Sequence, residues 1–159
     1  FMDTFMRLAV PFIAGLALLA LSACSSTPRV RYFPPQASIQ QLERQPGGNW
    51  QVQLRVQNFS TGAMQFKDIA LKIRFQDGEW LALRSADTLK VGANSAEIVS
   101  LMLTAPASTQ TVLSERLGKL QSVRYSLQGD LRSLDPNKTY PLTYEGRLNP
   151  APGLDGVFR

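Results

Sequence analysis

The sequence contains no histidine and a single cysteine, Cys24, among its 159 residues. Without histidine, the chain lacks the most common general base and the most common ligand of transition metals. A Ser-His-Asp triad is therefore excluded. A single cysteine can form neither an intramolecular disulfide nor a cysteine-rich metal site. We therefore expect no cofactor, and enzymes that depend on histidine are excluded.

The sequence also lacks any block of like charge. Lys and Arg total 17 and Asp and Glu total 12, so the net charge is +5, but the basic residues are scattered singly. A nucleic-acid surface needs clustered basic residues with interleaved aromatic ones, so we expect no nucleic-acid partner. A solvated basic surface is the simpler interpretation; weak attraction to anionic lipid headgroups or lipopolysaccharide is the alternative.

The first residues are predicted to be a targeting signal. Arg7 precedes an apolar run from Leu8 to Leu21, which is too short to span a bilayer comfortably and has the length of a signal-peptide core. The run ends in the tetrapeptide Leu21-Ser22-Ala23-Cys24. An ordinary signal peptide with a chance cysteine, or a short membrane anchor, is the competing interpretation.

That tetrapeptide resembles the lipobox of bacterial lipoproteins. The resemblance implies that Leu21, Ser22 and Ala23 are recognised by a signal peptidase and that Cys24 receives the lipid. Residues 1–23 would then be a signal peptide, and the protein would be held by acyl chains, which anchor stably when two or more are present. Ser25 stands where an Asp often retains such proteins in the inner membrane. We therefore expect an outer-membrane location, facing the periplasm.

Residues 24–36 are predicted to be a lipidated tether. Pro28, Pro34 and Pro35 favour an extended, semi-rigid chain. Tyr32 and Phe33 lie within it, and two placements remain open for them. They could rest on lipid headgroups, or they could plug one end of the following domain.

From residue 37 onward, apolar and polar side chains mostly alternate, which is typical of half-buried strands. The clearest alternation begins at Trp50, and a change of parity near Lys67-Asp68 predicts a β-bulge. Asp77-Gly78 predicts a hairpin. A single helix is expected near 108–120, capped by Ser108 or Thr109. Its apolar stripe comprises Val112, Leu113, Leu117 and Leu120.

Seven to eight short strands with one late helix predict an all-β domain over 37–149, an immunoglobulin- or fibronectin-like antiparallel β-sandwich. An up-and-down barrel is the structural alternative. Residues 150–159 are expected to form a C-terminal tail.

Four stretches carry a resemblance to a known family. They are WQVQLRVQN at 50–58, LKVGANS at 89–95, EIVSLML at 97–103 and YSLQG at 125–129. The chain resembles the late-embryogenesis-abundant type 2 domain, also called the water stress and hypersensitive response (WHy) domain, over about 37–149. In that family a proline usually follows the first stretch, whereas Phe59 follows here. The resemblance implies a sandwich without catalytic residues and an association with desiccation and stress protection.

The sequence contains candidate residues for three kinds of enzyme or metal site. Acid pairs for glycosidase-type catalysis, a Ser/Lys dyad and a calcium loop all need side chains at defined spacings. The candidates are Asp77 with Glu79, Asp130 with Asp135, Ser95 or Ser100 with Lys90, and Asp130, Asp135 and Asn137 for calcium. Turn or surface roles explain each group more simply, so we expect no enzyme and no metal.

The two tryptophans are predicted to have structural roles. Trp50 and Trp80 fit buried or hairpin-packing positions better than ligand platforms.

The favoured hypothesis is a non-catalytic envelope lipoprotein that binds or shields envelope components, attached to the membrane by its lipid. The alternative is an assembly subunit of an outer-membrane complex that pairs through a sheet edge with an envelope protein. A hydrolase of envelope glycans is a third hypothesis, and the sequence indicates no particular small-molecule ligand.

Overall fold

The computed structural model describes residues 28–159. Residues 1–27 are therefore outside the described part, and with them Leu21, Ser22, Ala23 and the predicted lipidation site Cys24. Within the described residues, no helix is long and apolar enough to cross a membrane.

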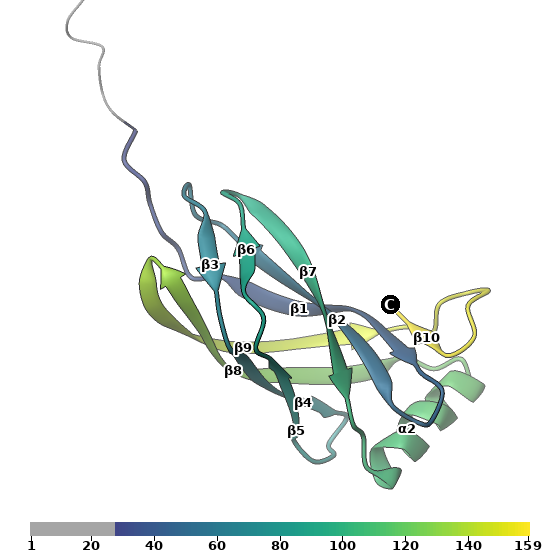
Figure 1. The fold of residues 1–159 in the computed structure, drawn as a ribbon. Coiled ribbons are helices and arrows are strands. Elements are labelled where there is room, and N and C mark those ends of the chain that lie inside the picture. The colour runs from purple at the N-terminus through teal and green to yellow at the C-terminus, as the bar shows by residue number, and fades with distance from the viewer. Residues whose placement is uncertain (1–27) are drawn as a thin grey trace, which may run out of the picture.

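Within residues 28–159, ten antiparallel strands form two sheets, which confirms the predicted all-β sandwich (Figure 1). The first sheet has the order β10 (Val157–Phe158), β1 (Gln36–Arg44), β2 (Trp50–Asn58) and β7 (Ser95–Leu103). In the second sheet, β8 (Val123–Asp135) lies between β9 (Asn137–Leu148) on one edge and β4 (Ile69–Phe75) with β3 (Met64–Phe66) on the other. β5 (Leu81–Ser85) then pairs with β4, and β6 (Leu89–Val91) with β3.

The predicted alternation places the core between the sheets. In β2, every second residue from Trp50 to Asn58 is buried and the residues between are half-buried. The change of parity at Lys67-Asp68 is where β3 ends and β4 begins, both paired with β8, and the register of β3 on β8 slips at Gln65/Phe66. The Asp77-Gly78 turn joins β4 to β5, as its sequence predicts.

The predicted helix is present as α2 (Ala107–Gly118), but its predicted N-cap is wrong. The helix begins one residue earlier, after Pro106, and no side chain caps it. Pro106 has φ −67° and an extended ψ of 163°, and its carbonyl accepts the first helical bond from Gln110 N–H (3.0 Å). The fixed proline φ sets this start instead of Ser108 or Thr109.

The domain does not end at residue 149, because the expected tail belongs to it. Phe158 in β10 is completely buried, and its ring packs on Trp50 with 6.3 Å between centroids. β10 pairs with Leu42 and Glu43 of β1. The prolines and glycines between 150 and 156 therefore form a loop that returns a last strand to the sheet.

The sandwich has two distinct ends (Figure 1). At the end that we call basal, the chain enters β1, and the loops β2–β3, β6–β7 and β8–β9 turn. At the opposite end, which we call distal, α2 and the loop before β10 lie together (Figure 1). The nine residues of β2 run from one end to the other, a span of about 27 Å at about 3.3 Å per residue.

Candidate functional site

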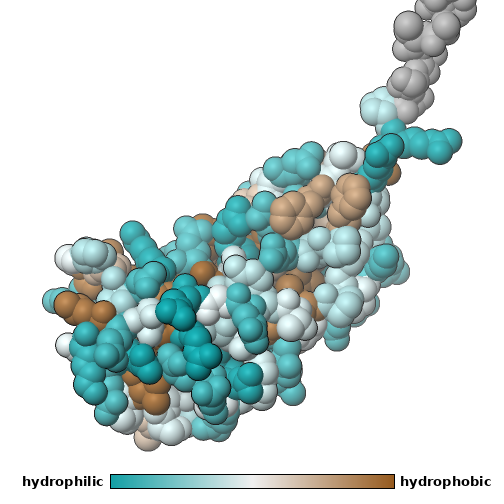
Figure 2. Space-filling model, turned by 180° about the vertical axis from the view of Figure 1, so that it is seen from behind, coloured by the Kyte–Doolittle hydropathy of each residue, from teal (hydrophilic) through white to brown (hydrophobic). Residues whose placement is uncertain are grey.

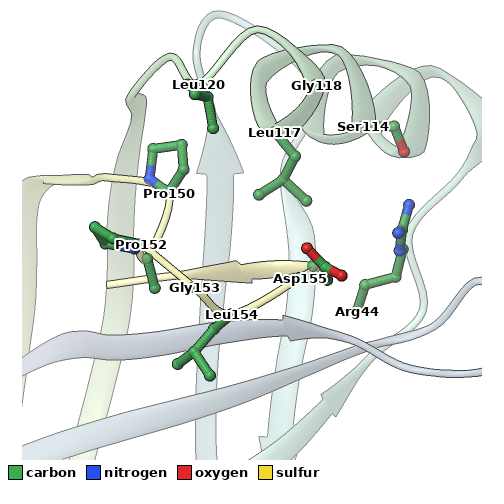
Figure 3. Close-up of a pocket in the computed structure, with 12 residues that line it drawn as sticks. Arg44, Ser114, Leu117, Gly118, Leu120, Pro150, Pro152, Gly153, Leu154 and Asp155 are labelled. Atoms are coloured by element: carbon green, nitrogen blue, oxygen red, sulfur yellow. The ribbon is translucent and has the colours of Figure 1, made fainter.

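The most substantial hollow described lies at the distal end, between the C-terminal half of α2 and the loop that precedes β10 (Figure 3). Its volume is about 640 Å³. Figure 3 shows apolar side chains of both elements around it: Leu117, Leu120, Pro150, Pro152 and Leu154. A concave, largely apolar site of this size is suited to binding the apolar part of another molecule.

Leu120 is the most unusual residue of this hollow. It has φ +52° and is 81% exposed. Its N–H donates to the Leu117 carbonyl (3.1 Å), and the Gln121 N–H donates to the Arg116 carbonyl (2.8 Å). These two bonds make a Schellman motif, in which glycine usually takes the left-handed position. A leucine there combines backbone strain with an exposed apolar side chain, which makes Leu120 a candidate contact residue of the hollow.

The prediction that Leu120 completes the buried stripe of the helix is therefore wrong. Leu113 is fully buried and Leu117 packs against the core, but the left-handed backbone turns the chain before Leu120 can follow them. Leu120 instead lies over the hollow, opposite Leu154, which is 46% exposed (Figure 3).

Hydrogen bonds hold the loop that forms the other wall. Ala151 N–H donates to the Val157 carbonyl (2.8 Å), and Asn149 and Arg159 exchange two backbone bonds. Arg44 N–H donates to the Gly156 carbonyl (2.9 Å), and Arg44 and Asp155 both line the hollow (Figure 3). The wall is thus pre-formed, which lowers the entropic cost of binding.

The acid pairs considered from the sequence have other roles. The Asp77 carboxylate lies 3.6 Å from the Arg124 guanidinium, with both side chains exposed, and Glu79 accepts a bond from the Ser108 hydroxyl (3.3 Å). Asp130 sits in the middle of β8, where it pairs with Ala70 of β4, whereas Asp135 ends the strand. The strand therefore separates the second pair.

The other candidates also stay apart. Ser95 and Ser100 of β7 face Asn58 and Gln53 across the sheet, and Lys90 faces Gln65. In residues 28–159, no group of three or more metal-ligating Asp, Glu, His or Cys side chains comes together.

Both tryptophans have structural surroundings. Trp50 is 1% exposed and belongs to the core. Trp80 is half-buried beside the β4–β5 turn, with the Arg74 guanidinium 4.7 Å from its ring centroid. Such a cation–π contact stabilises the hairpin by about 0.5–1 kcal/mol when exposed.

A buried tyrosine connects the two sheets. The Tyr125 hydroxyl in β8 accepts the Ile39 N–H of β1 at 3.0 Å. Burial of the hydroxyl raises the pKa of Tyr125 to about 12, although the bond from Ile39 opposes the shift. Burial, followed by the neighbouring Tyr32, also raises the pKa of Tyr140. Unlike Tyr125, the Tyr140 hydroxyl makes no hydrogen bond to the described residues.

Sequence reasoning missed Asn58, which organises the basal end. Its side chain is completely buried, and its amide donates to the carbonyls of Gly62 (2.8 Å) and Gly92 (2.9 Å), with that of Val91 at 3.3 Å. Its carbonyl oxygen accepts the Ser60 N–H (2.8 Å). The end of the WQVQLRVQN stretch was the available signal, because an Asn continues the buried parity of that strand.

Ser60 in turn fixes the predicted tether. Its hydroxyl accepts the Phe33 N–H (2.8 Å), while Thr61 N–H donates to the Arg31 carbonyl (3.0 Å) and Arg31 N–H to the Thr61 hydroxyl (2.8 Å). Residues 31–33 therefore lie along the β2–β3 loop. Tyr32 and Phe33 lie there at the end of the domain, where they remain 42% and 46% exposed.

Comparisons with known proteins add little to this description. No family model matches the chain, and no curated protein matches it. Among solved structures, the solution structure of AT1g01470 from Arabidopsis thaliana is similar with a TM-score of 0.48 and 12% identity, over 84% of this chain and 92% of that one. A protein from Archaeoglobus fulgidus is similar with a TM-score of 0.41 and 10% identity, over 76% and 98%. A FixG-related protein from Vibrio parahaemolyticus has a TM-score of 0.37 and 12% identity, over 71% and 94%. The assignment of the β-sandwich rests on the strand pairing of the chain itself.

Proposed function

We propose that this protein is a non-catalytic lipoprotein of the outer membrane, anchored through Cys24 and facing the periplasm, with a late-embryogenesis-abundant type 2-like domain. It binds envelope components by their apolar parts in the distal hollow. The scattered carboxylates support the non-catalytic part of the proposal, because neither acid pair forms a shared site.

One observation carries the proposal: the tether and the hollow lie at opposite ends of the sandwich (Figure 1). An anchor at Cys24 holds the basal end near the lipid. The exposed Leu120 and Leu154 then face away from the membrane, where a partner molecule can reach them. Burying one such leucine contributes about 1.5–3 kcal/mol, enough for a measurable affinity when several apolar groups combine.

Photo-crosslinking in intact cells tests this function. A photoreactive residue at position 120 should give specific adducts, and Leu154→Asp should abolish them. A photoreactive residue at Ala82, which is exposed on β5, is the matched control. Equal labelling from positions 120 and 82, or labelling that does not change with Leu154→Asp, would contradict binding in the hollow.

The stress role that the family resemblance implies needs a separate test. A deletion strain should survive drying and rehydration less well than the wild type. Complementation with the wild-type gene should restore survival, and complementation with Leu120→Asp should not. Equal survival of the deletion strain and the wild type would remove the stress role and leave binding in the hollow standing.

The edge of β7 supports the second candidate function, an assembly subunit. β7 ends the first sheet, and its sequence SAEIVSLML contains no Pro and one charged residue, Glu97, near its start, whereas prolines and charges commonly protect an edge. Ile98 and Met102 are 46% and 56% exposed on it. β9, the long edge strand of the other sheet, contains Pro141 and several charges. Crosslinks to one stoichiometric envelope protein that Ile98→Lys removes would favour this function; loss of those crosslinks with Leu120→Asp instead would assign them to the hollow.

A further inference from the structure

The basal end carries a surface that combines apolar and basic side chains. Four segments form it: 29–33, 58–62, 90–94 and 134–138, which we call the basal face. Hydrogen bonds tie the first three segments together. The Asn58 amide donates to the carbonyls of Gly62 and Gly92, and the Ser60 hydroxyl accepts the Phe33 N–H. The Asn94 N–H donates to the Ser60 carbonyl (2.9 Å). The fourth segment is the β8–β9 turn. Asp135 of this turn pairs with Gln65 of β3.

Exposed apolar side chains concentrate on this face. Although the four segments are a small part of residues 28–159, they contain five of the nine large apolar side chains that are exposed there. These are Val30 (57%), Tyr32 (42%), Phe33 (46%), Phe59 (41%) and Leu134 (39%). Figure 2 shows an apolar patch beside the point where the chain leaves the domain.

The same segments are basic. They contain four basic residues, Arg29, Arg31, Lys90 and Lys138, all exposed, against one acidic residue, Asp135. Lys138 also lies 5.2 Å from the Tyr140 ring centroid, which holds its ammonium group at this end. Aromatic rings flanked by Arg and Lys are the composition that settles in the headgroup layer of a membrane.

Covalent geometry limits how far this face can be from the anchor. Because residues 31–33 are bound to the β2–β3 loop, the chain available to separate the domain from Cys24 is short. Five steps along the backbone join Cys24 to Arg29, and an extended chain spans at most about 18 Å over them. A lipid at Cys24 therefore keeps the basal face within reach of the headgroups.

We propose that the basal face docks on the membrane surface, with its apolar side chains at the headgroup layer and its four basic residues on anionic lipid phosphates. The proposal rests on the proposed lipid attachment at Cys24. A lipid anchor alone does not fix the orientation of the domain. Docking of the basal face does fix it, so that the distal hollow points away from the bilayer. Each basic residue close to an anionic surface should favour docking by about fivefold.

Headgroup quenching tests the docking. Once Cys24 carries lipid, an introduced cysteine is the only free thiol, because the chain has one cysteine. Ala63→Cys on the exposed β2–β3 loop and Gln121→Cys after α2 would carry a fluorophore. The lipidated protein is reconstituted in phosphatidylcholine vesicles, or in a two-to-one mixture with phosphatidylglycerol, with nitroxide-labelled headgroups. We expect strong quenching at position 63 in the anionic vesicles and little at position 121.

A charge-reversal pair separates docking from simple tethering. Arg29→Glu with Arg31→Glu should lower quenching at position 63 severalfold in anionic vesicles, whereas Lys119→Glu with Arg147→Glu, at the distal end, should leave it unchanged. Quenching that responds equally to both pairs, or to neither, would overturn the docking while the anchor stands. Protein that does not float with the vesicles would refute the attachment at Cys24, and the docking with it.

Discussion

Replacing Asn58 should uncouple the loops of the basal end. The side chain is completely buried. Its amide donates two short hydrogen bonds, to the carbonyls of Gly62 and Gly92, and a longer one to that of Val91. Its oxygen accepts the Ser60 N–H. Asn58→Ala removes all of them and leaves buried backbone groups without partners. Each hydrogen bond contributes about 1 kcal/mol net, and each unsatisfied buried group costs about 1–3 kcal/mol. We therefore expect the free energy of unfolding to fall by about 2–4 kcal/mol.

A second substitution isolates the donor. Asn58→Asp keeps the shape and the acceptor for the Ser60 N–H, but at neutral pH it directs a carboxylate at the carbonyls of Gly62 and Gly92. Burial and these carbonyls would raise the pKa of the new carboxyl in the folded state. A raised pKa favours folding at low pH and removes that stability as the pH rises, so the variant should be less stable than Asn58→Ala at pH 7 and recover on acidification.

Denaturant unfolding followed by tryptophan fluorescence measures both effects, since Trp50 is in the core. Gln57→Ala is the control, because the half-buried Gln57 side chain accepts a bond from Arg55 alone among the described contacts. It should change stability by less than about 0.5 kcal/mol. If Asn58→Ala were no more destabilising than Gln57→Ala, the role of Asn58 as the organiser of the basal loops would be refuted.

Four further predictions concern the core and the hollow. Tyr125→Phe should lower the free energy of unfolding by about 1–3 kcal/mol, because it strands the Ile39 N–H, whereas Tyr140→Phe should be near neutral in the same denaturant titration. Gly146→Ala should cost about 1–3 kcal/mol by overpacking, since its Cβ would lie 2.6 Å from the Tyr125 ring; an unchanged thermal midpoint would contradict this. The pKa of Tyr125 is raised from 10.0 to about 12 by burial, so its contribution to stability is complete below pH 10 and is lost as the pH rises through about 12; Tyr125→Phe should flatten the alkaline decline in calorimetric midpoints. Leu120→Gly should raise the free energy of unfolding by about 1 kcal/mol, because glycine tolerates the left-handed position. The same substitution should lower the affinity of the hollow for its crosslinked partner at least tenfold. A variant that binds this partner like the wild type would refute the role of Leu120.

The local sequence pattern was sufficient to predict most of the strands and turns. The alternation from Trp50 to Val56 predicts β2 with its correct buried face, and Asp77-Gly78 predicts the turn between β4 and β5. These signals act over a few residues, and the period of two determines which side chains face the core. The order of the strands across the sheets was not predicted, since it depends on contacts between distant segments.

The errors have a common physical origin. Residues 150–159 resemble a tail because prolines and glycines dominate the local composition. Phe158 nevertheless lies in the core, where it packs against Trp50, more than a hundred positions earlier in the chain. Leu120 fits the helical period, but the Schellman bonds end the helix before it. In both cases a tertiary contact or a backbone reversal overrides the pattern, and the second case produces the candidate site.

The predicted lipidation site at Cys24 lies outside the described residues, and both proposals depend on it. The most direct test is the intact mass of the protein extracted with detergent from bacterial membranes. We predict a chain that begins at Cys24 and carries a diacylglyceryl group, and a Cys24→Ala variant that is neither processed nor lipidated. A wild-type chain that begins at any other residue, or that begins at Cys24 without added lipid, would contradict the anchored, oriented domain.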